Sequence, residues 1–98
     1  MKYRVQVREQ VKGFIATLGP ESRRKMRLAL RGLELERGDR LSLKEKLSGY
    51  PRLRVGGYRV VYRYLPGKVI ECVFAEERSL IYCLFEKDFL KHLRHESE

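Results

Sequence analysis

Residues 47–63, LSGYPRLRVGGYRVVYR, decide the fold of this chain. Short apolar runs on both sides of Gly56 and Gly57 predict two strands joined by a two-residue turn, for which glycine supplies positive φ angles. The same residues place positive charge beside aromatic and aliphatic side chains on a rigid hairpin. Such a surface is suited to hold a phosphate chain, because the guanidinium fork binds phosphate oxygens in pairs. The arginines concerned are Arg52, Arg54, Arg59 and Arg63.

A third strand is expected directly after this hairpin. Pro66 and Gly67 occupy the central positions of a predicted type II turn. Residues 69–75, VIECVFA, are apolar on both faces except at Glu71, which indicates a buried strand inside the sheet. The three strands should form an antiparallel meander, and the polar residues 76–79 are expected to turn the chain.

The residues before the hairpin predict one strand and two helices. Residues 2–7 alternate between apolar and polar side chains, the pattern of a half-buried strand. From Glu9 the apolar spacing becomes helical, and Gly19 is expected to close this short helix. Pro20 fits the first turn of a second helix, predicted to end at Gly38. The apolar stripes of the two helices are Val11, Phe14, Ile15 and Leu18, then Met26, Ala29, Leu30 and Leu33.

Three further segments complete the predicted fold. The basic run from Arg23 to Arg31 could bind nucleic acid, but a charge run on a helix is more often its solvated face, and we adopt that interpretation here. Residues 39–50 are expected to pack across the sheet edge. Residues 80–85 are either a strand or the approach to a last helix, which the apolar spacing places over residues 85–93.

The chain is therefore predicted to be an α+β protein with one domain over residues 1–98. It should have a mostly antiparallel sheet with an N-terminal strand, a helix pair on one face, a three-strand meander and a C-terminal helix. The other face of the sheet is left open, and it is the candidate site.

The charge of the chain favours a polyanionic partner. Its 98 residues include 22 Lys and Arg against 13 Asp and Glu, a net charge of +9. Residues 1–65 hold seventeen basic and six acidic groups, whereas residues 66–98 hold five basic and seven acidic groups. We expect nucleic acid, an acidic protein or an anionic surface to meet the first two thirds of the chain. No stretch approaches the roughly 20 apolar residues of a membrane span, so no membrane partner is expected.

Cysteine and histidine usage predicts a cytoplasmic protein without a metal. Cys72 and Cys83 lie in apolar surroundings, and the N-terminus lacks the apolar run of a secretory signal. With His92 and His95 they form a conceivable zinc set, but the short cysteine pair of structural zinc sites is missing. We expect no metal and no cofactor.

Two motifs resemble the RelE/ParE superfamily of bacterial toxins from type II toxin–antitoxin systems. They are L-x-G-x-x-x-L-R-V-G-x-Y-R-V-x-Y from Leu47 to Tyr62, and ERSLIY at residues 77–82. The resemblance implies a small toxin neutralised by a cognate antitoxin that wraps it. RelE-type members are mRNA interferases, endoribonucleases that inhibit translation by cutting mRNA on the ribosome, whereas ParE-type members poison DNA gyrase. A shared fold does not choose between these activities.

The resemblance also implies roles for individual residues. Arg59 matches the position that holds the scissile phosphate, and Arg52 and Arg54 match residues that contact the RNA. Tyr82 matches a tyrosine that stacks on a base or contacts the reacting ribose, and Arg78 is the nearby cation. Arg63 is expected to add general positive charge for RNA binding.

Three positions depart from the family pattern. Arg52 and Arg54 are arginines where RelE has lysines, which keeps the positive charge but weakens a role as general base. An ungapped match places Glu76 where the family has an arginine that assists the leaving group. Glu76 and Glu77 could supply a base, but adjacent acids in a turn are more often simply solvated. The leading hypothesis is metal-independent mRNA cleavage; the alternatives are a gyrase inhibitor without enzymatic activity and an inactive, basic RNA-binding relative.

Overall fold

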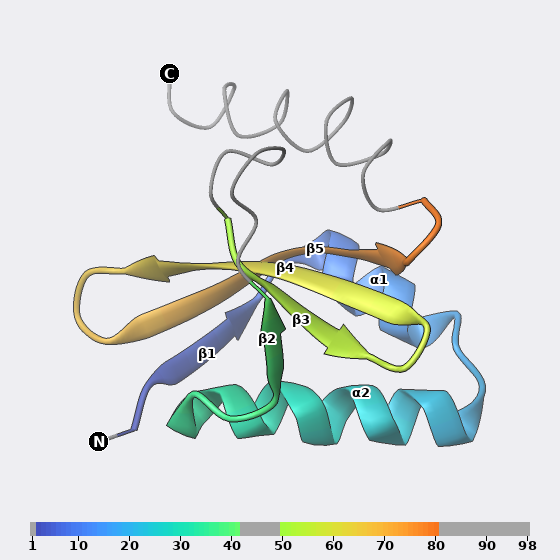
Figure 1. Ribbon diagram of the computed structural model, residues 1–98, viewed down its shortest axis with the longest axis horizontal. Helices are drawn as coiled ribbons and strands as arrows, with labels where there is room; N and C mark the ends of the chain where they lie inside the picture. Colours follow the sequence, from blue (N-terminus) through green and yellow to red (C-terminus); the bar gives the residue numbers. More distant parts are fainter. Residues whose placement is uncertain (1, 42–49, 81–98) are drawn as a thin grey trace.

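A mixed sheet with helices on one face is the framework of this protein (Figure 1). The computed structural model describes residues 2–41 and 50–80. These residues form a five-stranded sheet of order β1-β5-β4-β3-β2, in which β1 runs parallel to β5 and the other neighbours are antiparallel. The elements are β1 (Arg4–Val7), α1 (Glu9–Ala16), α2 (Pro20–Gly32), the 3-10 helix η1 (Leu33–Leu35), β2 (Asp39–Leu41), β3 (Arg52–Val55), β4 (Tyr58–Leu65) and β5 (Val69–Glu77). The predicted α+β class is confirmed, while the predicted C-terminal helix lies outside the described residues.

The meander of β3, β4 and β5 follows the prediction closely. Val55 lies opposite Tyr58, so a two-residue turn joins β3 to β4, and Gly56 adopts a φ of 59° in it. The next loop takes three residues, 66–68, because Lys68 joins Gly67 in the left-handed region, at φ 57° and 83° respectively.

The expected turn at residues 76–79 begins later than predicted. Glu76 and Glu77 continue β5, because Arg59 and Tyr58 on β4 still provide strand partners for them. Polar residues at the end of a strand thus have the same sequence pattern as a turn, and only the pairing distinguishes the two.

Both predicted helical stripes form the core against the sheet. Val11 and Ile15 of α1 and Met26 and Leu30 of α2 are buried, together with Leu33. They pack in one cluster with the sheet residues Leu53, Val60, Tyr62, Ile70, Cys72 and Ala75. This apolar burial fixes which face of the sheet the helices cover.

The second helix ends earlier than predicted, at Gly32 and not at Gly38. Glu36 takes the left-handed conformation at φ 54°, and the amides of Glu36 and Arg37 donate to the carbonyls of Leu33 and Gly32 at 2.9 and 3.0 Å. These two bonds form a Schellman motif, which satisfies the last helical carbonyls. Glycine usually takes the left-handed position there, so a glutamate gave no sequence signal.

The predicted packing at the sheet edge is a strand over residues 39–41. This β2 pairs with β3, with Arg40 opposite Leu53. Gly38 precedes it at φ 115°, and a Cβ at that position would lie 2.8 Å from the Leu53 Cδ1 atom. Glycine is therefore required for the chain to enter the edge strand, and residues 42–49 lie outside the described part of the chain.

Candidate functional site

Three of the predicted site arginines lie on one face of the sheet. Arg54 on β3 is the direct strand partner of Arg59 on β4, and Arg52 is two residues from Arg54. Directly opposed residues share a face, as do residues two apart in a strand. Since Leu53 and Val60 join the core beneath the helices, the arginines are on the opposite face.

This arrangement concentrates positive charge. Like charges directly opposite each other in a sheet are unfavourable, and Arg54 and Arg59 form such a pair. The pKa of the Arg52 guanidinium is lowered, first by burial and then by the positive charge of Arg54. An anion at this face would relieve the repulsion, and the planar guanidinium groups suit phosphate oxygens.

Arg59 is the most deeply placed of the three arginines. Its side chain is 5% exposed, and its Nη1 donates to the carbonyl oxygens of Gly56 at 3.0 Å and Tyr58 at 2.8 Å. The guanidinium therefore stabilises the hairpin turn as well as contributing charge. Arg54 is exposed, so an approaching phosphate meets Arg54 before it meets Arg59.

A carboxylate extends the arginine row across the sheet. Glu76 on β5 is the direct strand partner of Arg59, so Arg54, Arg59 and Glu76 lie side by side on three neighbouring strands. The Oε1 atom of Glu76 accepts a hydrogen bond from the Glu77 amide at 3.0 Å. A proton acceptor thus stands next to the cations, which is the pairing that acid–base chemistry at a phosphate needs.

The end of β5 is held in place by two contacts. The Gln10 side chain of α1 donates to the Ala75 carbonyl and accepts from the Ala75 amide, both at 2.8 Å. Beyond the strand, the Arg78 amide donates to the Gly57 carbonyl at 2.9 Å. Arg78 is exposed and lines an open pocket of about 450 Å³ with Gly57, Tyr58, Glu77 and Ser79. Arg78 therefore lies beside the hairpin turn.

Arg63 lies apart from the other arginines. It lies four positions after Arg59, about 13 Å along the strand. Its Nε and Nη2 atoms both contact Glu71 Oε1 at 2.7 Å, and Arg8 Nε lies 3.3 Å from the second carboxylate oxygen. This local neutralisation gives Arg63 a partner within the sheet. Sequence reasoning overlooked both neighbours. Glu71 is the strand partner of Arg63 beyond a register shift between β4 and β5, and Arg8 directly follows β1, which pairs in parallel with β5.

The sheet face that carries the arginines, opposite the helices, is open to solvent only in part. Val61 and Phe74, a directly opposed pair in its middle, are 0% and 7% exposed. The exposed residues of the site thus gather at the end with the hairpin turn. Tyr82, the remaining predicted site residue, lies outside the described residues.

Residues 2–41 and 50–80 contain no group of three His, Cys, Asp or Glu side chains as a metal site would require. No helix there is long and apolar enough to cross a membrane.

Comparison with known proteins shows which solved structures share this fold. No protein-family model and no curated protein matches the chain. One chain of the archaeal RelE–RelB complex from Pyrococcus horikoshii OT3 matches with a TM-score of 0.60 and 28% identity, over 80% of this chain and 97% of that chain. One chain of a RelBE-type toxin–antitoxin complex from Mycobacterium tuberculosis matches with a TM-score of 0.66 and 20% identity, over 80% and 100% of the two chains. An arginine-to-alanine double mutant of the E. coli toxin RelE in the free state matches with a TM-score of 0.58 and 17% identity, over 93% and 98%.

These matches agree with the motifs found in the sequence. The two structures at 20% and 17% identity establish the shared fold, and the archaeal complex adds the higher sequence similarity. The chain thus has the fold of the RelE-type toxins in these structures, and its motifs resemble those of the RelE/ParE superfamily.

Proposed function

We propose that this toxin cleaves mRNA on the ribosome. The observation that supports the proposal most directly is the row of Arg54, Arg59 and Glu76 on one sheet face. When an RNA 2′-hydroxyl attacks the adjacent phosphorus, a base must take its proton and cations must stabilise the charge that develops on the phosphate. The row offers both kinds of group.

Each of the three arginines contributes differently to binding the phosphate. Arg54 is exposed and meets the scissile phosphate first, and Arg52 supplies a second charge two residues away. Arg59 adds charge from beneath while its bonds to the turn carbonyls hold the hairpin that presents the others. None of the three is assigned to proton transfer, because arginine is a poor general base at neutral pH.

Glu76 is the residue that we assign to proton transfer. Its carboxylate stands on the strand next to Arg59 and accepts the 2′-hydroxyl proton in this scheme. The 2′-oxygen then bonds to phosphorus and the bond to the 5′-oxygen breaks, so the departing oxygen needs a proton. The proton that Glu76 has taken up is returned to this oxygen through solvent water. The family resemblance gives Arg78 as the nearby cation and Tyr82 as the residue that stacks on a base or contacts the reacting ribose.

A cognate antitoxin is the proposed protein partner. Two of the similar structures are complexes of a RelE-type toxin with its antitoxin. Residues 1–65 carry seventeen basic and six acidic groups, which an acidic segment would complement. Co-purification of a small acidic protein from the native host tests this proposal, and recovery of the chain with no such protein would contradict it.

One observation favours a second function, inhibition of DNA gyrase. The family arginine that assists the leaving group is replaced by Glu76, which removes a cation from the reaction. A toxin that only blocks gyrase would not need that arginine. A supercoiling assay with the purified protein separates the two functions.

The test of the proposal is cleavage of mRNA on translating ribosomes. Arg54→Gln removes one transition-state cation and should slow cleavage by about 10²–10³-fold. Glu76→Gln should slow it by about 10²–10⁴-fold and remove the acidic limb of the pH–rate profile. Arg37→Gln is the control, because Arg37 is exposed and its amide donates to the Gly32 carbonyl at the end of α2. These surface changes are cleaner than Arg59→Ala, which would also remove the two bonds to the turn.

Equal cleavage by the Arg54→Gln and Arg37→Gln proteins would remove the site assignment. Inhibition of gyrase by the wild-type protein, without mRNA cleavage, would replace the proposed function with the second one.

A further inference from the structure

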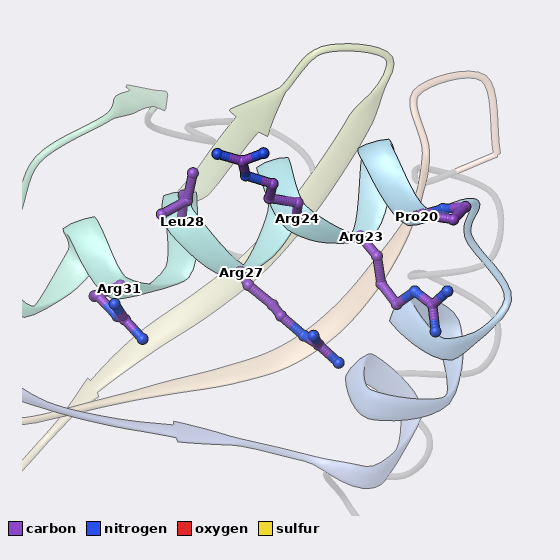
Figure 2. Close-up of a pocket in the computed structure, with 6 residues that line it drawn as sticks. All are labelled: Pro20, Arg23, Arg24, Arg27, Leu28 and Arg31. Carbon is purple, nitrogen blue, oxygen red and sulfur yellow. The ribbon is translucent and has the colours of Figure 1, made fainter.

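The outer surface of α2 carries a concentrated positive charge. The helix has five basic residues and one acidic residue, Glu21. Met26 and Leu30 pack into the core, so the charged residues face away from the sheet. An open groove of about 280 Å³ follows this surface (Figure 2), lined by Pro20, Arg23, Arg24, Arg27, Leu28 and Arg31.

The four arginines of this groove differ from most other cations of the described chain. Their side chains form no hydrogen bond or ion pair with any residue of the structure as described over 2–41 and 50–80. Elsewhere, Arg63 pairs with Glu71, and Lys2 pairs with Glu34 at 3.4 Å. Even on α2, the one acidic residue, Glu21, pairs with a lysine outside the groove. The groove therefore keeps its full positive charge.

The spacing of the arginines suits a repeating anion. Arg23, Arg27 and Arg31 are four residues apart, so they form a row with about 6 Å between steps along the helix axis. Figure 2 shows this row projecting to one side of α2, while Arg24 and Leu28 project to the other. Like charges four residues apart repel each other on a helix, so the row is unfavourable for the isolated protein. A chain of phosphates would relieve this repulsion at every step.

A nucleic acid fits this groove better than a protein segment does. An acidic helix would bury an apolar stripe of its own, yet the groove offers one exposed apolar side chain beyond its proline, Leu28 at 56% exposure. Four guanidinium groups without protein partners instead match phosphate oxygens, which accept their paired donors.

We propose that the outer face of α2 is a second RNA-binding surface, which binds the sugar-phosphate backbone of a folded RNA. It lies on the helix side of the sheet (Figure 1), opposite the face that carries Arg54 and Arg59. The two surfaces therefore bind different RNA segments. The solvated-face interpretation of the sequence is replaced by this one. Binding at α2 does not depend on cleavage at the sheet face, so either proposal can fail alone.

The experiment measures the affinity for a short RNA duplex across a series of salt concentrations. The variant changes Arg23, Arg27 and Arg31 to Gln. The control changes three exposed lysines outside α2, Lys2, Lys12 and Lys68, to Gln, and thereby removes the same charge elsewhere. Each phosphate contact contributes about 0.9 to the slope of log K against log salt for a duplex. The arginine variant should lose about 2–3 in that slope, while the control stays close to wild type.

Folding of the variant is checked by its melting temperature. Gln and Arg have similar helix propensities, and removal of the like-charge pairs relieves repulsion, so the variant should melt at or above the wild-type temperature. The single change Arg27→Gln provides a milder test and should lower the slope by about 1.

Three results would overturn the proposal. Equal losses in the arginine variant and the lysine control would show that only net charge matters. Wild-type RNA binding by the arginine variant would assign the binding to another surface. Displacement of the RNA by polyglutamate as effectively as by unlabelled RNA of equal charge would assign the groove to an acidic protein.

Discussion

Glu71 offers the sharpest test of how charge is organised on the sheet. Its side chain is 13% exposed and lies between Arg63, with two contacts of 2.7 Å, and Arg8, with one of 3.3 Å. Glu71→Gln keeps the shape of the side chain but removes the negative charge that both guanidinium groups contact. Breaking a buried pair costs about 3–5 kcal/mol, whereas an exposed pair contributes about 0.2–1 kcal/mol.

The partial exposure of Arg63 and Arg8, 30% and 23%, places the expected loss between these limits, at about 2 kcal/mol. For a domain of this size, that loss lowers the melting temperature by roughly 10 °C. Thermal unfolding followed by circular dichroism measures it. Glu34→Gln is the matched control, because Lys2 pairs with Glu34 at the surface and the loss should be within about 0.5 kcal/mol.

A double-mutant cycle with Arg63→Gln completes the test. If Arg63 and Glu71 form a unit, the double variant should lose less stability than the two single losses added together. Additive losses, or a Glu71→Gln protein that melts with the Glu34→Gln control, would refute the assignment of Arg63 to a structural pair. Arg63 would then return to the RNA-binding surface.

Three further predictions concern single side chains. Gly13→Ala should stabilise the protein by about 0.5–1 kcal/mol, because Gly13 lies inside α1 and a Cβ there meets nothing within 4 Å. Gly38→Ala should cost about 2 kcal/mol or more, because φ is +115° and the Cβ would lie 2.8 Å from the buried Leu53. Urea denaturation that gave both changes the same sign would be inconsistent with this geometry. Burial, with a smaller effect from the neighbouring Glu71, raises the pKa of the Cys72 thiol to about 12. In a Cys83→Ser protein, where Cys72 is the remaining thiol, labelling near pH 8 should therefore be slow until the protein unfolds, and rapid labelling of the folded protein would count against a buried thiol. Burial, and then a hydrogen bond to Glu36, raises the pKa of Tyr64 to about 12. Because an unfolded tyrosine ionises near pH 10, the stability that neutral Tyr64 contributes to the folded protein is complete below about pH 10 and is lost as the pH rises toward 12. Tyr64→Phe should remove that part of the alkaline loss, and an unchanged pH dependence of unfolding would disprove it.

Local signals explain which parts of the fold were predictable. The hairpin was predicted because Gly56 and the alternating residues around it act within one short segment. The core stripes of α1 and α2 were predicted because helical periodicity is also local. The end of α2 was missed because Glu36, an unusual residue in the left-handed position, closes the helix. The strand β2 was missed because three residues give too little periodicity.

The site depended more on contacts between distant segments. The sequence brought Arg54 and Arg59 together correctly, since a two-residue turn fixes their register. It placed Glu76 in a turn, because nothing in a pair of acidic residues shows that β4 extends beside them. The charge run on α2 looked like an ordinary solvated face, and only the side-chain contacts reveal that its arginines have no partner among residues 2–41 and 50–80.

Sequencing of mRNA ends after induced expression in bacteria is the most direct test of the central claim. The account predicts new ends in phase with codons in cells that express the wild-type protein or Arg37→Gln, and their loss with Arg54→Gln at equal protein level. Growth arrest by the wild-type protein without new mRNA ends, together with inhibition of gyrase supercoiling by the purified protein, would contradict it.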